Sequence, residues 1–195
     1  MKGIPIANEF VGRTLEIHQI EESLLPRDED SGRKFVVLHG LGGIGKTQLA
    51  VKFARKNQRQ YDSVFWLDGR TEQSLKNSLT EVGKRLPQGQ VPESVRTFTI
   101  GSSGELDTVI KHVLDWFNCQ GNTKWLLIFD NVDDPDAYDI IKFMPDADHG
   151  SILITTRRRS FAHYGKDIQV TTVSQDEARS ILSNTSGRTL QGNCC

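Results

Sequence analysis

The chain has 195 residues, of which 25% are charged, and its formal net charge is -1 at pH 7. A chain of this length can bury its own core as one domain, and its balanced charge argues against a nucleic-acid binder. Three cysteines without regular spacing predict neither a disulfide framework nor a zinc site, and no apolar run approaches the roughly 20 residues of a membrane span. We therefore expect a cytoplasmic protein with no nucleic-acid partner and no membrane contact.

The first feature along the chain is the stretch FVGR at residues 10–13. Taken alone, it predicts a turn that precedes a helix beginning near Thr14. We assign residues 1–30 to an N-terminal segment and helix, and residues 31–185 to the core of the domain. Residues 186–195 show no periodicity and are expected to form an unstructured tail.

A glycine-rich motif follows, since residues 40–47 read GLGGIGKT and match G-x-x-x-x-G-K-[ST] at every fixed position. The apolar residues 35–39 before it predict a buried strand, and residues 45–59 after it predict a helix. Consecutive glycines let backbone amides turn toward an anion, and the start of the helix adds unpaired N–H groups. In such a phosphate-binding loop, Lys46 reaches the β- and γ-phosphates and Thr47 ligates Mg²⁺. The candidate nucleotide-binding residues of the loop are Gly40, Gly42, Gly43, Ile44, Gly45, Lys46, Thr47 and Gln48.

Beyond this loop, short apolar runs alternate with helical patterns. Four further strands are predicted, at residues 64–68, 125–130, 151–155 and 168–171. Helices are predicted at about residues 71–86, 104–118, 134–142 and 174–184, with a surface loop at residues 87–104. This alternation implies right-handed βαβ crossovers, and therefore an α/β fold whose parallel sheet is covered on both faces.

The strand at residues 125–130 ends in Asp130, which is the Walker B pattern. An aspartate at this place lies at the carboxyl edge of the sheet, where ligands of open α/β folds bind. In isolation it would equally suit a helix cap. Beside a phosphate loop, however, it is suited to hold Mg²⁺ together with Thr47.

The position after Asp130 usually carries a carboxylate that activates water, and here it is Asn131. An amide cannot accept a proton as a general base. Asp133 or Asp134 either substitutes for that base or caps a helix that begins at Pro135.

A third motif lies at residues 151–157, where an apolar strand ends in two threonines and Arg157. If this strand borders the strand before the phosphate loop, Arg157 points at the position of the γ-phosphate, where a fixed cation stabilises charge. The alternative is a solvated basic turn, which is also how we interpret Arg158 and Arg159. The candidate catalytic residues are therefore Lys46, Asp130 and Arg157.

With these motifs in order, the chain resembles the NB-ARC class of STAND P-loop NTPases, the nucleotide switches of NOD-like receptors. Residues 36–50 and 63–68 are similar to fungal NB-ARC proteins that often carry TPR arrays. The resemblance implies a P-loop NTPase three-layer sandwich with a five-stranded parallel sheet in the order 2-3-4-1-5. It also implies that Val11, Gly12 and Arg13 lie near the adenine and the ribose.

The function that the resemblance implies is an ATP/ADP-binding regulatory switch of an NLR-like signalling protein, with Mg²⁺ as its metal. NB-ARC proteins commonly have two acids after the Walker B strand, so Asn131 predicts slow or absent hydrolysis. The family's helical lid and winged helix should follow the last helix, and the short sequence 186–195 predicts truncation before them. Protein partners or self-association are expected. Two alternatives stay open: an active ATPase or small-molecule kinase, and a degenerate nucleotide-binding adaptor that acts through protein–protein interaction.

Overall fold

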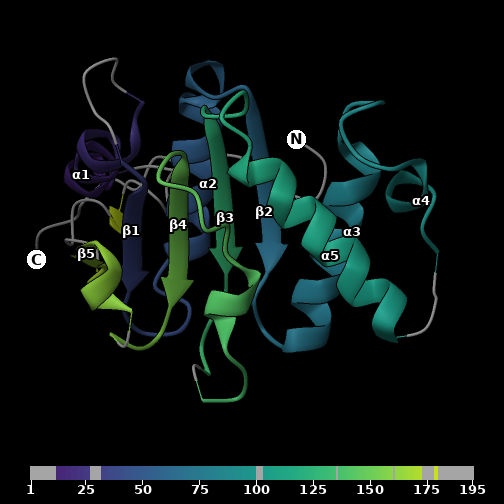
Figure 1. Cartoon of the computed structure of the whole chain (residues 1–195). Helices are drawn as coiled ribbons and strands as arrows, with labels where there is room; N and C mark the ends of the chain where they lie inside the picture. Colours follow the sequence, from purple (N-terminus) through teal and green to yellow (C-terminus); the bar gives the residue numbers. More distant parts are fainter. Residues whose placement is uncertain are drawn as a thin grey trace, which may run out of the picture.

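A single parallel sheet forms the centre of the protein (Figure 1). The computed structural model describes residues 12–26, 32–99, 103–134, 136–159, 161–172 and 178–179. Within them, the strands pair in the order β2-β3-β4-β1-β5, and every pair is parallel. The predicted parallel sheet and its order are therefore confirmed. The strands are β1 (Lys34–His39), β2 (Ser63–Asp68), β3 (Trp125–Asp130), β4 (Ser151–Thr156) and β5 (Lys166–Gln169).

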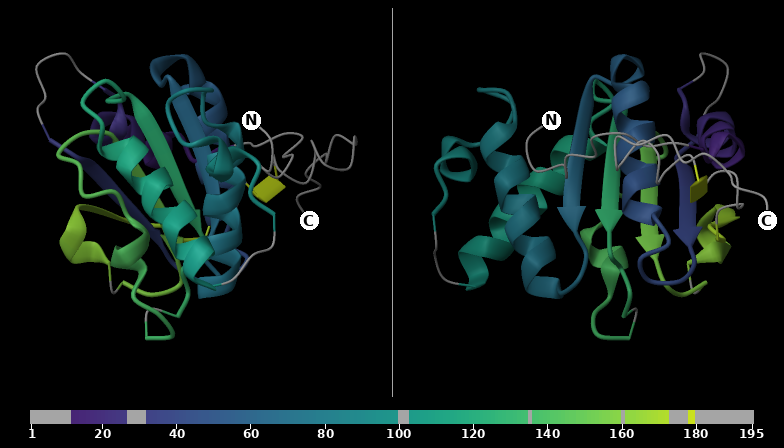
Figure 2. Two further views of the ribbon diagram at one scale, coloured as in Figure 1. Left: turned by 45° about the vertical axis from the view of Figure 1, so that its right-hand side comes forward. Right: turned by 180° about the vertical axis from the view of Figure 1, so that it is seen from behind.

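Helices cover both faces of the sheet, which makes the fold a three-layer sandwich (Figure 2). One face carries α1 (Thr14–Leu24) and α2 (Lys46–Lys56), and α2 lies behind the strands in Figure 1. The other face carries α3 (Glu72–Arg85), α4 (Glu93–Arg96) and α5 (Ser103–Asn118). Short 3-10 turns occur at η1 (Gln58–Gln60), η2 (Ile140–Phe143) and η3 (Ala162–Tyr164). None of the helices described is long and apolar enough to cross a bilayer.

The central strands are apolar on both sides because each side meets a helical layer. In β1, Phe35 and Val37 belong to the core under α3 and α5, whereas Val36 and Leu38 belong to the core under α1 and α2. The strands β3 and β4 are buried along their whole length. This double burial is why the sequence shows continuous apolar runs at these strands instead of alternation.

Several predicted elements differ from the structure. The α-helix expected at residues 134–142 is wrong: the described residues 136–139 are irregular and lead into η2. Tyr138, Ile140 and Phe143 are all buried in the core, at a spacing that no single α-helical face offers. The loop expected at 87–104 contains the single turn of α4, which buries Val95. The last strand begins two residues earlier than predicted, at Lys166.

The predicted N-terminal helix is confirmed as α1. Most of residues 1–30 outside α1, and the whole of the predicted tail 186–195, lie outside the described residues. The helix expected at 174–184 also lies outside them, apart from residues 178–179, which are helical.

Substitution of Gly150 tests how tightly the start of β4 packs. Gly150 has φ 80°, and a Cβ there would lie 2.2 Å from Cε2 of Trp125, a buried indole. Gly150→Ala is therefore expected to lower the free energy of unfolding by about 2–4 kcal/mol, through backbone strain and overpacking. Urea denaturation measures this, with Gly121→Ala as the control because no atom lies within 4 Å of its Cβ position. A loss below about 0.5 kcal/mol for Gly150→Ala would contradict the packing.

Candidate nucleotide-binding site

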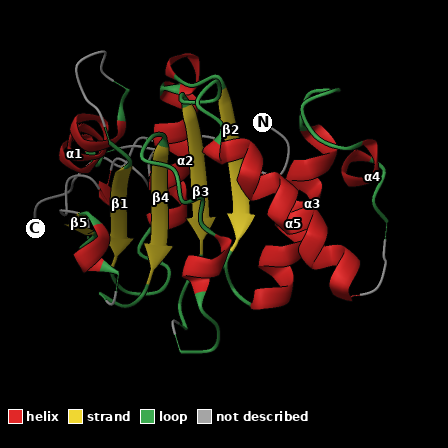
Figure 3. Cartoon of the chain, in the orientation of Figure 1, coloured by secondary structure: helices red, strands yellow, loops and turns green. Residues whose placement is uncertain are grey.

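The candidate site lies at one edge of the sheet, where the strands β1 to β4 all end (Figure 3). Strand β4 pairs with β1 on one side and β3 on the other. The phosphate loop after β1, Asp130 at the end of β3 and Arg157 after β4 are therefore brought to neighbouring strand ends. The condition on which the Arg157 prediction depended, that its strand borders β1, is met.

The phosphate loop adopts conformations that only glycine accommodates easily. Gly43 and Gly45 have φ angles of 74° and 100°, and nothing approaches their Cβ positions within 4 Å. Gly40 has φ 145°, and a Cβ there would lie 2.3 Å from the carbonyl oxygen of Val170. Gly45 is the N-cap of α2, where no described side chain caps the helix. The first amides of α2 therefore remain available to an anion.

Lys46 is folded onto the loop that precedes it. Its Nζ donates to the carbonyl oxygens of Gly40, at 2.8 Å, and Leu41, at 2.9 Å, and the residue is only 8% exposed. Burial lowers the pKa of the Lys46 ammonium, the charge of Asp133 acts to raise it, and Arg157 acts to lower it. The ammonium now binds two neutral carbonyl oxygens. Charged phosphate oxygens would be stronger acceptors for it, so Lys46 fits the role of a phosphate ligand.

Asp130 is held at the centre of a hydrogen-bonded cluster. Its Oδ1 accepts from Oγ1 of Thr47, at 2.9 Å, and from Oγ1 of Thr155, at 2.5 Å. Its Oδ2 accepts from Nδ2 of Asn131 at 3.0 Å. Burial raises the pKa of the Asp130 carboxyl, and the hydrogen bonds from the two threonines act to lower it. A carboxylate and a hydroxyl in direct contact form the oxygen-rich pair that Mg²⁺ selects, so these residues fit that metal.

The role of Thr155 was not predicted from the sequence. Its hydroxyl donates to Asp130 and accepts from the backbone N of Asn131 at 2.9 Å, and the residue is fully buried. Asn131 itself is in the left-handed region, with φ 62°. The available signal was a pair of hydroxyl residues, Thr155 and Thr156, at the end of an otherwise apolar strand. Thr155 thus fixes both the carboxylate and the backbone that follows it.

Arg157 lies against the phosphate loop, since a Cβ on Gly42 would come within 3.2 Å of its Cζ. Its Nε forms an ion pair with Oδ2 of Asp133 at 2.8 Å, and its backbone N donates to Oδ1 of the same residue at 2.8 Å. The helix cap expected at Asp133 or Asp134 is wrong for Asp133, because its carboxylate binds Arg157 and the described residues 136–139 form no helix. Arg157 remains 65% exposed on its side chain.

The neighbouring arginines agree with the predicted basic turn and have acidic partners of their own. Arg158 Nη1 lies 3.4 Å from Oδ2 of Asp136, and Arg159 Nε lies 2.7 Å from Oδ2 of Asp167. Both side chains are mostly exposed, so these pairs contribute little to stability.

Gly12 and Arg13 reach the same edge of the sheet, whereas Val11 lies outside the described residues. Both residues have positive φ angles, of 81° and 60°. The Nη2 atom of Arg13 donates to the carbonyl oxygens of Ile44, at 3.0 Å, and Thr171, at 2.7 Å. Arg13 therefore links the phosphate loop to the chain that leaves β5. Gln48 lies in the first turn of α2 and is partly exposed.

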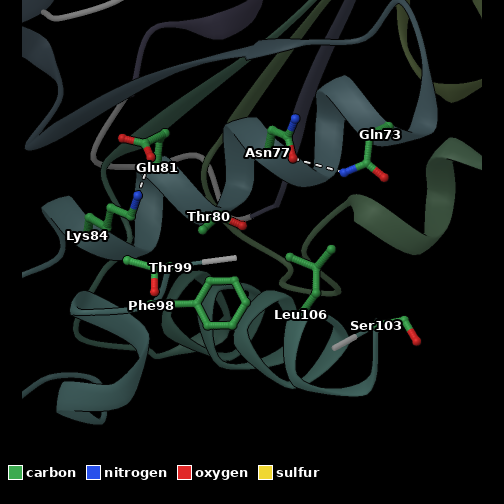
Figure 4. Close-up of a pocket in the computed structure, with 9 residues that line it drawn as sticks. All are labelled: Gln73, Asn77, Thr80, Glu81, Lys84, Phe98, Thr99, Ser103 and Leu106. Atoms are coloured by element: carbon green, nitrogen blue, oxygen red, sulfur yellow. Dashed lines mark hydrogen bonds and ion pairs between the residues drawn. The ribbon is translucent and has the colours of Figure 1, made fainter. Parts of the chain in front are cut away.

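A hollow that is separate from the candidate site lies between α3 and α5 (Figure 4). This cavity of about 1050 Å³ is lined by Phe98 and Leu106 on one side and by polar residues of α3 on the other. Its charged lining consists of Glu81 and Lys84, which pair with each other at 2.5 Å. No residue of the phosphate loop lines this hollow, so it is not part of the candidate nucleotide site.

Comparison with solved structures supports the fold at low sequence identity. The chain is similar to Cdc6p from Pyrobaculum aerophilum, with a TM-score of 0.62 and 13% identity, over 93% of this chain and 52% of that one. It is also similar to the Aeropyrum pernix ORC1 protein, solved in complex with DNA, with a TM-score of 0.58 and 16% identity, over 95% and 51% of the two chains. These likenesses establish a P-loop NTPase fold.

Sequence comparison identifies the family. The chain is 26% identical to a nucleotide-binding leucine-rich repeat (NLR)-like protein of Hyaloscypha variabilis. The match extends over 185 residues and covers 86% of this chain. It is 26% identical over 156 residues, or 78% of its length, to the putative disease resistance RPP13-like protein 3 of Arabidopsis thaliana. The chain spans 18% of the length of each of these relatives. The family profile of the NB-ARC domain matches residues 13–191, and the chain therefore belongs to the NB-ARC family.

Proposed function

We propose that the protein is an ATP/ADP-binding regulatory switch that uses Mg²⁺ and hydrolyses ATP slowly or not at all. The observation that carries this proposal is the meeting of the phosphate loop with the Thr47–Asp130 pair at one sheet edge, in a chain of the NB-ARC family. In the proposed site, Lys46 and the loop amides bind phosphates, Thr47 and Asp130 hold the metal, and Arg157 faces the terminal phosphate. The bound metal would neutralise phosphate charge.

Gly12 and Arg13 are proposed to lie near the adenine and the ribose. Support comes from the hydrogen bonds of Arg13 to Ile44, inside the phosphate loop, and to Thr171, after β5. These contacts bring Arg13 to the same end of the sheet as the phosphate loop. The nucleotide-binding core is proposed to cover residues 31–185, with residues 1–30 as its N-terminal addition.

Slow hydrolysis is proposed because the position directly after Asp130 carries an amide where a water-activating carboxylate is usually expected. Asn131 occupies the next position, and its amide donates to Asp130. Asp133 uses both carboxylate oxygens to bind Arg157. A general base must be able to reach the attacking water. Asn131 carries an amide, which cannot act as a base, and the Asp133 carboxylate is directed at Arg157.

The relatives suggest the setting in which the switch acts. One is described as NLR-like and another as a putative disease resistance protein, and this chain corresponds to 18% of their length. We propose that the domain serves cytoplasmic innate-immunity signalling, in which nucleotide exchange toggles contacts with protein partners or with further copies of the chain. Such toggling requires that the two nucleotides make different contacts in the two states.

Calorimetric titration of the full chain with ADP and ATP, with and without Mg²⁺, tests the proposal directly. We expect both nucleotides to bind in the micromolar range and multiple-turnover phosphate release to stay below about 1 s⁻¹. Asn131→Asp is expected to raise that rate by about tenfold or more, because it supplies a carboxylate at the missing position. Asn77→Asp on α3 makes the same chemical change away from the sheet edge and serves as the control.

Each alternative gives a different result in that experiment. Phosphate release faster than about 1 s⁻¹ by the unaltered chain would indicate a turnover ATPase or kinase instead of a switch. Affinities in the millimolar range for both nucleotides would indicate a degenerate adaptor.

A further inference from the structure

The ion pair between Asp133 and Arg157 lies beside the phosphate loop and is not explained by binding of the metal. Arg157 contributes the cation that lies against Gly42, and Asp133 engages it through both carboxylate oxygens. The two residues come from different connections, since Asp133 follows β3 and Arg157 follows β4. The pair therefore exists only because these strands are neighbours in the sheet.

The backbone around Asp133 is fixed by its own hydrogen bonds. The backbone N of Val132 donates to the carbonyl oxygen of Thr155 at 2.9 Å, and the backbone N of Asp133 donates to that of Asn131 at 2.9 Å. The side chain of Val132 is buried beneath this turn. A tight turn that is hydrogen-bonded to β4 therefore holds Asp133 in place. The backbone of this turn positions the Asp133 carboxylate next to Arg157.

The negative charge of Asp133 lies beside the phosphate loop. Oδ2 of Asp133 pairs with Nε of Arg157 at 2.8 Å, and the guanidinium of Arg157 lies against Gly42 of that loop. A nucleoside triphosphate brings one more phosphate, and therefore more negative charge, than a diphosphate. Any negative charge near the loop consequently disfavours the triphosphate more than the diphosphate.

We infer that Asp133 is a specificity-determining residue that biases the site toward the diphosphate. It does so by neutralising Arg157, the cation that lies against the loop, and by adding its own negative charge near the terminal phosphate. This inference rests on the proposed nucleotide-binding function and adds to it the residue that sets the preference between ADP and ATP. A resting state with bound ADP follows from that bias without any contact from a further domain.

Two other roles for Asp133 fit the structure less well. A helix cap requires a helix after it, and the segment that follows is a turn leading to η2. A general base must face the attacking water, and the Asp133 carboxylate is directed at the backbone N and the guanidinium of Arg157.

The test measures the ratio of ATP affinity to ADP affinity, with Mg²⁺, by calorimetric titration of the full chain. Asp133→Asn keeps an oxygen that can accept from the backbone N of Arg157 but removes the charge, and we expect it to raise the ratio about five- to tenfold. Arg157→Gln removes the cation from the same pair, and we expect it to lower the ratio by a similar factor. The double variant removes a neutral pair and should return close to the ratio of the unaltered chain.

The matched control is Asp136→Asn. Asp136 lies in the same connection after β3 as Asp133, but it pairs with Arg158. Its ratio should stay within about twofold of the unaltered chain, because exposed charges farther from the loop are screened. If Asp133→Asn leaves the ratio unchanged, or if it shifts the ratio in the same direction as Arg157→Gln, the inference is overturned. A purely structural pair would give that second result, because breaking it from either side would perturb the site alike. Absence of binding of either nucleotide to the unaltered chain would instead defeat the proposed function itself.

Discussion

Replacing Lys46 by methionine is expected to weaken binding of both ADP and ATP by about 3 kcal/mol, or about 100-fold. Lys46 is 8% exposed as a residue, and its ammonium is held at the loop by the carbonyl oxygens of Gly40 and Leu41. Because the Lys46 side chain is buried, a charge-assisted bond from it to phosphate is stronger than one from an exposed lysine. Methionine keeps the apolar stem, so the packing of α2 against β1 should survive.

Lys56→Ala is the appropriate control for the loss of charge. Lys56 lies in the last turn of the same helix, is half-exposed and pairs with Glu21 instead of the loop. Calorimetric titration should show wild-type affinities for this variant, and urea denaturation should show that Lys46→Met is folded. If Lys46→Met binds both nucleotides as tightly as the unaltered chain, residues 40–47 do not bind phosphate.

Replacing Asp130 by asparagine is expected to abolish most of the gain in ATP affinity that Mg²⁺ provides. The carboxylate accepts from Thr47, Thr155 and Asn131, so its position is fixed before any metal binds. Loss of a group that orients or holds a metal typically costs 10- to 100-fold in metal affinity. The Mg²⁺ dependence of ATP affinity, titrated for each variant, measures this loss.

The same substitution should leave the fold intact or make it more stable. The amide of Asn131 can turn so that its oxygen faces the new side chain at position 130, which keeps every donor paired. Burial raises the pKa of the Asp130 carboxyl, so the folded state binds its proton more tightly than the unfolded state does. The stability of the unaltered chain therefore falls as pH rises through the interval between the two pKa values. The stability advantage of Asp130→Asn should grow over that interval and then level off.

Asp68→Asn distinguishes this role from a general effect of charge at the sheet edge. Asp68 ends the neighbouring strand β2 in register with Asp130 and binds Arg70 instead of Thr47. The Asp68→Asn variant should therefore keep the Mg²⁺ dependence of ATP affinity that the unaltered chain shows. A Mg²⁺ dependence that persists in Asp130→Asn and disappears in Asp68→Asn would reverse the assignment of the metal site.

The outcome of these two substitutions bears on different parts of the proposal. Lys46 tests whether the loop binds phosphate, and Asp130 tests whether a metal joins it. If Asp130→Asn raises the free energy of unfolding and lowers Mg²⁺-dependent ATP binding, Asp130 is present for function at a cost in stability.

The sequence by itself determined the phosphate loop, the parallel sheet and Asp130, because the signals for these features are local. The glycines within residues 40–47 permit the backbone conformation of the loop, and a helix begins directly after the last of them. Strands buried on both faces need continuous apolar runs, which are visible without knowing what covers them. The order of the strands came from the family resemblance and is confirmed in the structure.

Only the tertiary structure decided which partners the site residues take, because those partners are distant in the chain. Arg13 reaches Thr171, Thr155 holds Asp130, and Asp133 binds Arg157, and each contact depends on which strand ends are neighbours. The same reason explains the wrong helix at residues 134–142, where burial of Tyr138, Ile140 and Phe143 in the core overrides local preference. Local chemistry identified the site, and the strand order selected the contacts that tune its charge.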